Sequence, residues 1–374
     1  MKKICFFINS GWYFELHWLE RAKCLLEEGF QVHIISHFNE SEIERFSRSG
    51  LYCHNTNMRE RSLNPFAAAV DYIKITRLLR NINPSLIHAI TIKPILIAGF
   101  YARLKKIPFV ASFVGLGRVF MYETPLFKML SYLVCKCYDF IFKNIKSRLI
   151  FEHAQDLQRL TNLVDINKSQ CSVIDGVGIN IDSYFYCKEE VAGKPIVLFA
   201  GRMLRSKGLE VLVDINKNMQ SKGKGFRLNV AGIEVPDDPD SIPHSVILDW
   251  HNAGFINWLG KRDDVGQLIQ ASHIIALPSV YFEGVPRILI EGASKGRACI
   301  AFDSGGCSSI IADGINGFLI PCGDKSAFEK KLLILLTNSQ LRHEMGIAGR
   351  RIVEERFSSE MVLKKTTVLY SEIL

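Results

Sequence analysis

Short apolar runs alternate with amphipathic segments along the first half of the chain. KICFFI predicts a buried strand, residues 13–28 predict an amphipathic helix closed by Gly29, and QVHIIS predicts the next strand. The alternation continues through SLIHAI, a helix over about 94–105, PFVASFV, a long helix over about 125–144, and SRLIFE. Strands separated by helices pair in parallel, so this half predicts a doubly wound α/β unit.

The alternation restarts after a loop near residues 182–193. The strands expected there are PIVLFAG, FRLNVAG, SHIIALP, ACIAFD and FLIPCGD. The helices expected there cover residues 209–220, 265–271 and 326–336, with two more beginning at Val285 and after Gly306. A chain of 374 residues exceeds one ordinary core, so we expect domains over 1–185 and 186–357. Ligands should bind beyond the carboxyl ends of the strands, in the cleft between two such domains.

The composition is that of a folded protein, with 48% hydrophobic and 22% charged residues. Ten cysteines are scattered without Cys-x2-Cys spacing, which favours buried free thiols in a reducing cytoplasm over a disulfide framework or a cysteine metal site. The start, MKKICFFINSG, has only five apolar residues before Asn9, so it predicts a first strand and not a secretion signal.

Positive charge is concentrated in the first half. Residues 1–187 hold 23 Lys and Arg against 16 Asp and Glu, whereas residues 188–374 hold 23 against 22. The longest apolar region, 125–142, carries Lys128, Lys136 and Asp139, so it is too polar to cross a membrane but could lie in the interface. We expect a peripheral position on an anionic membrane surface, with a solvated basic face as the alternative. No basic run or aromatic signature indicates nucleic acid.

Residues 278–291, PSVYFEGVPRILIE, place two carboxylates on either side of a turn that opens a helix. Glu283 precedes the turn and Glu291 lies well inside the helix. Gly284 allows another group to approach the backbone, and Pro286 suits the first helical position, where its missing N–H is not needed. The N–H groups of that first turn can then hold an anion, for which a nucleotide diphosphate is the natural candidate.

A second segment offers cations at a strand end. The strand PIVLFAG runs directly into RMLRSKG, which places Arg202 and Lys207 just past the strand and at a helix start. Two cations with oriented N–H groups could hold a diphosphate. Taken alone, Arg202 and Lys207 could equally be solvated surface side chains. Likewise, Arg287 and Glu291 could form a surface ion pair one helical turn apart.

These segments together resemble the retaining GT-B glycosyltransferases of group 1 (family 4), of the bacterial surface-polysaccharide type. The Glu-x7-Glu spacing and the strand-Gly-Arg-x4-Lys-Gly segment carry the resemblance, which covers residues 190–357 well. In the first half it is looser and rests on HAITIKP, ASFVGLGRVF, FEHAQD and VIDGVGINID. It implies two Rossmann-like domains facing a cleft, with a C-terminal helix over 358–374 packing back on the first domain.

The resemblance also implies roles for the site residues. Arg202, Lys207 and the backbone of residues 284–287 (Gly284, Val285, Pro286 and Arg287) would neutralise charge on the departing β-phosphate, without a metal or other cofactor. Glu291 would hold the ribose hydroxyls and Glu283 would touch the donor sugar or its phosphate. Gly260 and Lys261 of NWLGKRDDV would lie near the nucleotide base.

The chain departs from this family at one position. Many members carry a histidine before a glycine where this sequence has Val114 and Gly115, so Thr91, Lys93 or Ser112 are alternative contacts to the donor sugar. His88 and His153 sit near strand ends, where a lone histidine is more often a structural hydrogen-bonding residue. The pairs at 237–238 and 263–264 are acidic but fall in polar loops, so we expect no metal site.

The sequence thus predicts transfer of a sugar from a nucleotide diphosphate donor, UDP-hexose or UDP-N-acetylhexosamine, to a saccharide acceptor. The expected acceptor is lipid-linked, in O-antigen, capsule or exopolysaccharide assembly. A hydride-transferring Rossmann enzyme is the main alternative, but Gly115 and Gly117 lack the third glycine of its fingerprint. A sugar-nucleotide epimerase or phosphorylase, or a non-catalytic lectin-like protein, would share the fold.

Overall fold

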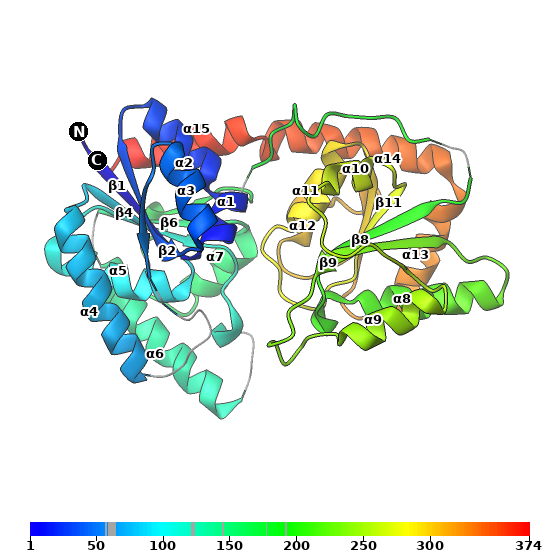
Figure 1. The fold of residues 1–374 in the computed structure, drawn as a ribbon, viewed down its shortest axis with the longest axis horizontal. Helices are drawn as coiled ribbons and strands as arrows, with labels where there is room; N and C mark the ends of the chain where they lie inside the picture. The colour runs from blue at the N-terminus through cyan, green and yellow to red at the C-terminus, as the bar shows by residue number, and fades with distance from the viewer. Residues whose placement is uncertain (57, 59–64, 121–123, 144–145, 177, 191–192) are drawn as a thin grey trace. The chain divides into compact units, whose positions relative to one another are not determined.

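The computed structural model describes the chain except for residues 57, 59–64, 121–123, 144–145, 177 and 191–192 (Figure 1). The chain forms two compact units, one made of Met1–Gly178 with Val362–Leu374 and the other of Ile179–Met361. The division therefore falls before the predicted boundary after residue 185, and the return to the first unit begins at residue 362 and not at 358.

The first unit is built on a parallel sheet of seven strands in the order β3-β2-β1-β4-β5-β6-β7. Its strands are β1 (Lys3–Ser10), β2 (Gln31–His37), β3 (Tyr52–Asn55), β4 (Leu86–Ile90), β5 (Phe109–Phe113), β6 (Ser147–Phe151) and β7 (Cys171–Val173). The residues of β4 and β5 are buried along their whole length, because helices cover both faces of the sheet. The predicted doubly wound α/β unit is confirmed.

Helices cover both faces of this sheet. They are α1 (Gly11–His17), α2 (Leu19–Glu27), α3 (Glu40–Arg48), α4 (Pro65–Ile82), α5 (Ile92–Lys105), α6 (Pro125–Phe142), α7 (Ala154–Thr161) and α15 (Ser359–Ser371). One core contains Phe6 with side chains of α1, α2, α3 and α15, and the other contains Phe7 with side chains of α4, α5 and α6. The helix predicted over 13–28 is wrong as a single element, since it breaks at Trp18, whose φ is −128°. Of the helix predicted over 125–144, residue 144 lies outside the described residues.

A buried polar chain holds the C-terminal helix on the first unit. His88 Nδ1 is hydrogen-bonded to the Tyr370 hydroxyl of α15, and His88 Nε2 lies 2.7 Å from Ser112 Oγ. All three side chains are buried, and burial lowers the pKa of His88 well below 6.5, with the Arg21 charge adding to the effect. His88 therefore has the structural role that the sequence indicated.

The second unit has a parallel sheet of six strands in the order β10-β9-β8-β11-β12-β13. Its strands are β8 (Ile196–Arg202), β9 (Arg227–Ile233), β10 (Asn257–Trp258), β11 (Ile274–Leu277), β12 (Ala298–Phe302) and β13 (Gly317–Ile320). Its helices are α8 (Leu209–Ser221), α9 (His244–Asn252), α10 (Val265–Gln270), α11 (Arg287–Ser294), α12 (Cys307–Ile310), α13 (Lys325–Thr337) and α14 (Ser339–Ile352). In Figure 1, α8 and α9 lie on one side of this sheet, and α10 and α11 lie on the other.

The strand order of the second unit reverses between β8 and β11. From β8 the chain moves outward to β9 and β10, and from β11 it moves outward in the other direction to β12 and β13. In doubly wound sheets, ligands bind beyond the carboxyl ends of the two strands at such a reversal. Lys207, Glu283 and Glu291 lie in the segments that follow β8 and β11, whereas Arg202, which was predicted just past the strand, is the last residue of β8.

Candidate active site

Two of the predicted catalytic residues form an ion pair. Lys207 ends a short 3₁₀ turn over Arg205–Lys207 after β8, and its Nζ lies 2.5 Å and 2.7 Å from the two carboxylate oxygens of Glu283. The side chains are only 13% and 9% exposed, so this pair is not a solvated surface contact. Ser279 Oγ donates to Glu283 Oε1 at 2.6 Å. The sequence predicted that Lys207 and Glu283 share a site but not that they pair, and it missed Ser279.

Close backbone packing brings the segments after β8 and β11 together. Val280 N and Tyr281 N both donate to the carbonyl of Ser206, at 2.9 Å and 3.1 Å. Gly208 follows with φ +81°, and a Cβ there would lie 1.8 Å from the carbonyl oxygen of Pro278. Only glycine permits both this backbone conformation and this approach. The position of Lys207 beside Glu283 therefore depends on the glycine that follows it.

The loop after β12 supports the backbone of Glu283 and Gly284. Gly306 N donates to the Glu283 carbonyl at 2.9 Å. A Cβ on Gly305 would lie 2.1 Å from that oxygen, and a Cβ on Gly306 would lie 2.5 Å from the Gly284 carbonyl. The Gly-Gly pair marks a tight turn in the sequence, but its contact with residues 283–284 has no sequence signal.

Glu291 lies on the buried side of α11. Its Oε1 accepts hydrogen bonds from Arg287 Nε at 2.7 Å and from the Tyr184 hydroxyl at 2.9 Å. Burial disfavours the charged guanidinium, but the Glu291 carboxylate outweighs it and raises the pKa of Arg287. The ion pair one turn apart exists, yet Glu291 is only 5% exposed, so the surface interpretation is wrong.

The start of α11 lies after both residues that the sequence placed at its beginning, Val285 and Pro286. The helix begins at Arg287, and Pro286 is its N-cap with φ −67° and an extended ψ of 119°. Pro286 was expected at the first helical position. Its fixed φ fits both positions, and the extended ψ is what excludes it from the helix. Val285 is buried beside it in the core of the second unit.

Glycines line the carboxyl ends of the strands on the other side of the reversal. Gly232 N donates to the Gly260 carbonyl at 2.9 Å, and a Cβ on Gly232 would lie 2.1 Å from the Gly201 carbonyl. A Cβ on Gly201 or Gly260 would meet nothing within 4 Å, so the space above these two residues is open. Lys261, which follows, is exposed. Such a surface can accept a flat group close to the backbone.

Arg202 is the end residue of β8 and is half-buried. Within the described part of the chain, its side chain forms no hydrogen bond or ion pair, unlike Lys207. Lys261 also has no such partner there. The predicted residues thus form two paired clusters, Lys207 with Glu283 and Arg287 with Glu291, whereas Arg202 and Lys261 carry unpaired charges at the same edge of the sheet.

The other polar candidates belong to the first unit. His153 caps α7: its Nδ1 accepts from Asp156 N at 3.4 Å, and its Nε2 lies 3.2 Å from Asp156 Oδ2, with both side chains buried. Ser112 is buried in the core, where its Oγ is hydrogen-bonded to His88 Nε2. Thr91 has φ +72°, unusual for a β-branched residue, and its Oγ1 accepts from Asn9 Nδ2 at 2.9 Å. Thr91 and Lys93 remain predictions for the sugar contact.

Acidic and cysteine residues form no metal centre in the described ranges. Those residues contain no group of three or more His, Cys, Asp or Glu side chains placed to hold an ion. Asp264 accepts two hydrogen bonds from Arg262, at 2.7 Å and 2.6 Å, and these bonds lower its pKa. All ten cysteines are free thiols, but the prediction that they are buried holds only for Cys5, Cys135, Cys299 and Cys307. Five others are partly buried and Cys322 is exposed.

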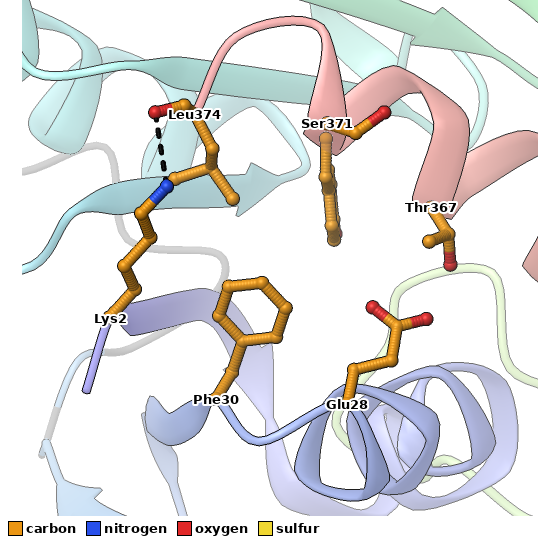
Figure 2. Close-up of a pocket in the computed structure, with 7 residues that line it drawn as sticks. Lys2, Glu28, Phe30, Thr367, Ser371 and Leu374 are labelled. Atoms are coloured by element: carbon orange, nitrogen blue, oxygen red, sulfur yellow. Dashed lines mark hydrogen bonds between the residues drawn. The ribbon is translucent and has the colours of Figure 1, made fainter.

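A small pocket of about 220 Å³ lies elsewhere, in the first unit (Figure 2). It is lined by Lys2, Glu28, Phe30, Thr367, Tyr370, Ser371 and Leu374. Figure 2 shows Lys2 at one wall, where its Nζ donates to the Leu374 carbonyl at 3.3 Å. Lys2 and Phe30 precede the amino ends of β1 and β2, so this pocket lies at the edge opposite to the one where doubly wound folds bind ligands.

Comparisons with known families match both units. The sequence model of the family described as "Glycosyl transferases group 1" matches residues 185–352, and that of "Glycosyl transferase 4-like" matches residues 3–152.

Curated relatives agree with these matches. The chain is 26% identical over 327 residues to the N,N'-diacetylbacillosaminyl-diphospho-undecaprenol alpha-1,3-N-acetylgalactosaminyltransferase of Campylobacter jejuni, covering 84% of each chain. It is 24% identical over 180 residues to the capsular polysaccharide biosynthesis glycosyltransferase CapM of Staphylococcus aureus, of which it covers 46%.

Solved structures share the fold across the chain. A glycosyltransferase from Rickettsia africae superposes with a TM-score of 0.78 at 21% identity, covering 100% of this chain and 98% of that one. Anabaena Alr3699/HepE in complex with UDP superposes with a TM-score of 0.80 at 18% identity, covering 100% of both chains. These likenesses show the fold of two parallel-sheet Rossmann-like domains.

Proposed function

Because the chain belongs to the group 1 glycosyltransferases, with the GT-B fold, we propose that it moves a sugar from a nucleotide diphosphate to a saccharide acceptor with retention of the anomeric configuration. The observation that carries this proposal is that the Lys207–Glu283 and Arg287–Glu291 pairs both lie on segments that follow β8 and β11, the two strands at the reversal of the second unit. Because the family consists of glycosyltransferases, its assignment argues against a hydride-transferring Rossmann enzyme and against a non-catalytic lectin-like protein.

The proposed catalysis rests on stabilising the leaving group. As the glycosidic bond breaks, negative charge develops on the β-phosphate, and preorganised donors aimed at that charge lower the barrier. Arg202 has no partner in the described chain, so it can bind phosphate without first breaking an ion pair. To bind phosphate, Lys207 must either give up its ion pair with Glu283 or contact both groups at once. The backbone N–H groups at the start of α11 add further donors.

We propose a UDP-hexose or UDP-N-acetylhexosamine donor and a lipid-linked saccharide acceptor, within O-antigen, capsule or exopolysaccharide synthesis. The Campylobacter relative supports this choice, because it is named as an enzyme that transfers N-acetylgalactosamine to a diphospho-undecaprenol-linked saccharide. The Staphylococcus relative is named for capsular polysaccharide biosynthesis. The HepE structure, which was solved in complex with UDP, supports a uridine nucleotide.

We also propose that the first unit docks on an anionic membrane surface at the cytoplasmic side. The outer face of α6 exposes apolar side chains at Leu126, Met129, Tyr132 and Leu133, each at least half exposed, while its inner face is buried in the core. Lys128 and Lys136 interrupt this apolar face. Apolar side chains mixed with lysines are typical of a helix that lies in the interface. Within the described ranges, the helices are all too short or too polar to span a bilayer.

Sedimentation with liposomes tests the docking proposal. Wild-type protein should bind anionic vesicles at low salt and less at high salt, and the Met129→Glu variant should bind more weakly. Ile334→Glu, an exposed apolar position on α13, is the control and should behave as wild type. Equal binding to neutral and anionic vesicles would contradict electrostatic docking but would leave sugar transfer untouched.

The reaction itself is tested with a panel of UDP-, GDP- and dTDP-sugars. Donor hydrolysis identifies the nucleotide and sugar, and NMR of the product with an added acceptor reports the anomeric configuration. We expect one donor class to be favoured, retention in the product, and a rate nearly unchanged by EDTA. Products formed without an acceptor would instead indicate the epimerase or phosphorylase alternative. Strict dependence on Mn²⁺ or Mg²⁺ would contradict the metal-free mechanism.

A further inference from the structure

The Tyr184 hydroxyl reaches the candidate donor site from outside the motifs that define it. Tyr184 precedes β8 and is 107 residues from Glu291, yet its hydroxyl donates to Glu291 Oε1 at 2.9 Å. Arg287 Nε donates to the same oxygen at 2.7 Å. A carboxylate oxygen has two lone pairs, so these two donors fill Oε1. Within the described residues, Oε2 of Glu291 accepts no hydrogen bond.

Both the backbone and the ring of Tyr184 are held by neighbouring residues. Its carbonyl accepts from Ser294 Oγ of α11 and from Arg350 Nη1 of α14, both at 2.8 Å. The Lys295 ammonium lies 5.8 Å from the ring centroid. A Cβ on Gly266 of α10 would lie 3.4 Å from ring atom Cε1. The backbone of Tyr184 is therefore held by α11 and α14, and its ring lies against Lys295 and Gly266, so the hydroxyl reaches Glu291 without a large loss of side-chain entropy.

The hydroxyl keeps its proton throughout the working range of an enzyme. Burial, followed by the negative charge of Glu291, raises the pKa of Tyr184 to about 12. Tyr184 is therefore a donor, and never an anion that would repel Glu291, at neutral or mildly alkaline pH.

We propose that Tyr184 is a positioning residue of the donor site, which together with Arg287 occupies Oε1 of Glu291 and leaves Oε2 to accept a ribose hydroxyl. This inference rests on the proposed function, in which Glu291 binds the ribose. A carboxylate fixed by two donors cannot rotate away from the sugar, so the ribose contact is formed without ordering Glu291 on binding. The consequence is selectivity for ribonucleotides over 2'-deoxyribonucleotides.

The Tyr184→Phe variant tests the proposal, because phenylalanine keeps the ring packing and removes only the hydroxyl. Calorimetric titration with UDP and GDP, and with 2'-deoxy-UDP and 2'-deoxy-GDP, measures affinity and ribose selectivity. We expect the Kd for the favoured ribonucleotide to rise roughly tenfold, the scale of one hydrogen bond to a charged group, and the penalty for the 2'-deoxy form to shrink. In turnover, the donor KM should rise while kcat changes little.

Tyr186→Phe is the matched control. Tyr186 lies two residues along the same segment. Its hydroxyl lies 3.5 Å from His343 Nδ1, and His343 is not a residue of the candidate site. This variant should keep wild-type affinity and selectivity. Tyr186→Phe should melt as wild type does, whereas Tyr184→Phe loses a hydrogen bond to a buried carboxylate and should melt a few degrees lower. The reduced selectivity for ribose, which a general loss of packing would not cause, separates positioning from destabilisation.

Glu291→Ala separates failure of this inference from failure of the proposed function. If Glu291→Ala weakens nucleotide binding while Tyr184→Phe binds both nucleotide forms as wild type does, the positioning role is overturned and the donor site stands. If wild-type protein binds neither UDP nor GDP, the proposed function and this inference fail together. If Tyr184→Phe lowers affinity and Tyr186→Phe does the same, the effect belongs to the segment and the proposal is also overturned.

Discussion

The burial of the ion pair between Lys207 and Glu283 allows us to predict how far the free energy of unfolding falls when either side chain is replaced. Two unit charges 4 Å apart interact by about 4 kcal/mol at an effective dielectric constant of 20, and this pair is closer. Desolvation cancels much of that attraction, but removal of one partner leaves the other charge buried and unpaired. We therefore expect Lys207→Met and Glu283→Gln each to lower the free energy of unfolding by about 3 kcal/mol. The double variant should lose less than the sum.

A double-mutant cycle measures this coupling by urea unfolding of the four proteins. We expect a coupling energy of about 1–3 kcal/mol, typical of residues that share one buried network. The control cycle uses Arg205→Met and Glu210→Gln, an ion pair in the neighbouring turn whose side chains are 48% and 36% exposed. That exposed pair should couple by less than about 1 kcal/mol. Equal coupling in the two cycles would refute the view that burial gives the Lys207–Glu283 pair its strength.

Three further predictions concern other parts of the chain. Arg202→Ala should cost about 2–4 kcal/mol of transition-state stabilisation, measured as a loss of kcat/KM, and a loss under threefold would exclude it from the leaving-group site. Gly305→Ala should lower the free energy of unfolding by about 2–4 kcal/mol, because its φ is +58° and its Cβ would meet the Glu283 carbonyl; an unchanged urea midpoint would contradict this close contact. His88 stays neutral in the folded protein, so the unfolded state takes up a proton below pH 6.5 and stability should fall from pH 7 to 5. That fall should be shallower in His88→Gln, and identical slopes would contradict the buried, neutral histidine.

The strands that could be predicted are those buried on both faces. SLIHAI and PFVASFV are continuous apolar runs because the helices of the first unit cover both sides of β4 and β5. The edge strand β3, Tyr52–Asn55, is partly exposed and polar, so it carries no such run. The helix α3 was missed because its start is a polar capping box between Asn39 and Glu42. The break at Trp18 has no glycine or proline to mark it.

The candidate site could be predicted only as far as local sequence places its residues. Glu283 and Glu291 flank a turn, and Lys207 follows a strand, so their common location at the carboxyl ends of the strands followed from the order of elements, whereas the strand reversal there did not. Their partners depend on tertiary packing. Tyr184 reaches Glu291 across 107 residues, and no spacing in the sequence connects the two. Gly208 and Gly305 are recognisable as turn glycines, but the backbone that each contacts is not.

Steady-state kinetics of Glu291→Ala and Glu283→Ala test the central claim most directly, namely that the strand reversal of the second unit is the donor site. With the donor found in the panel, Glu291→Ala should raise the donor KM with a smaller change in kcat, because it removes a ground-state contact with the ribose. Glu283→Ala should chiefly lower kcat, because the proposed mechanism places Glu283, which is paired with Lys207, near the reacting phosphate. Wild-type kinetics in both variants would contradict the assignment of this site.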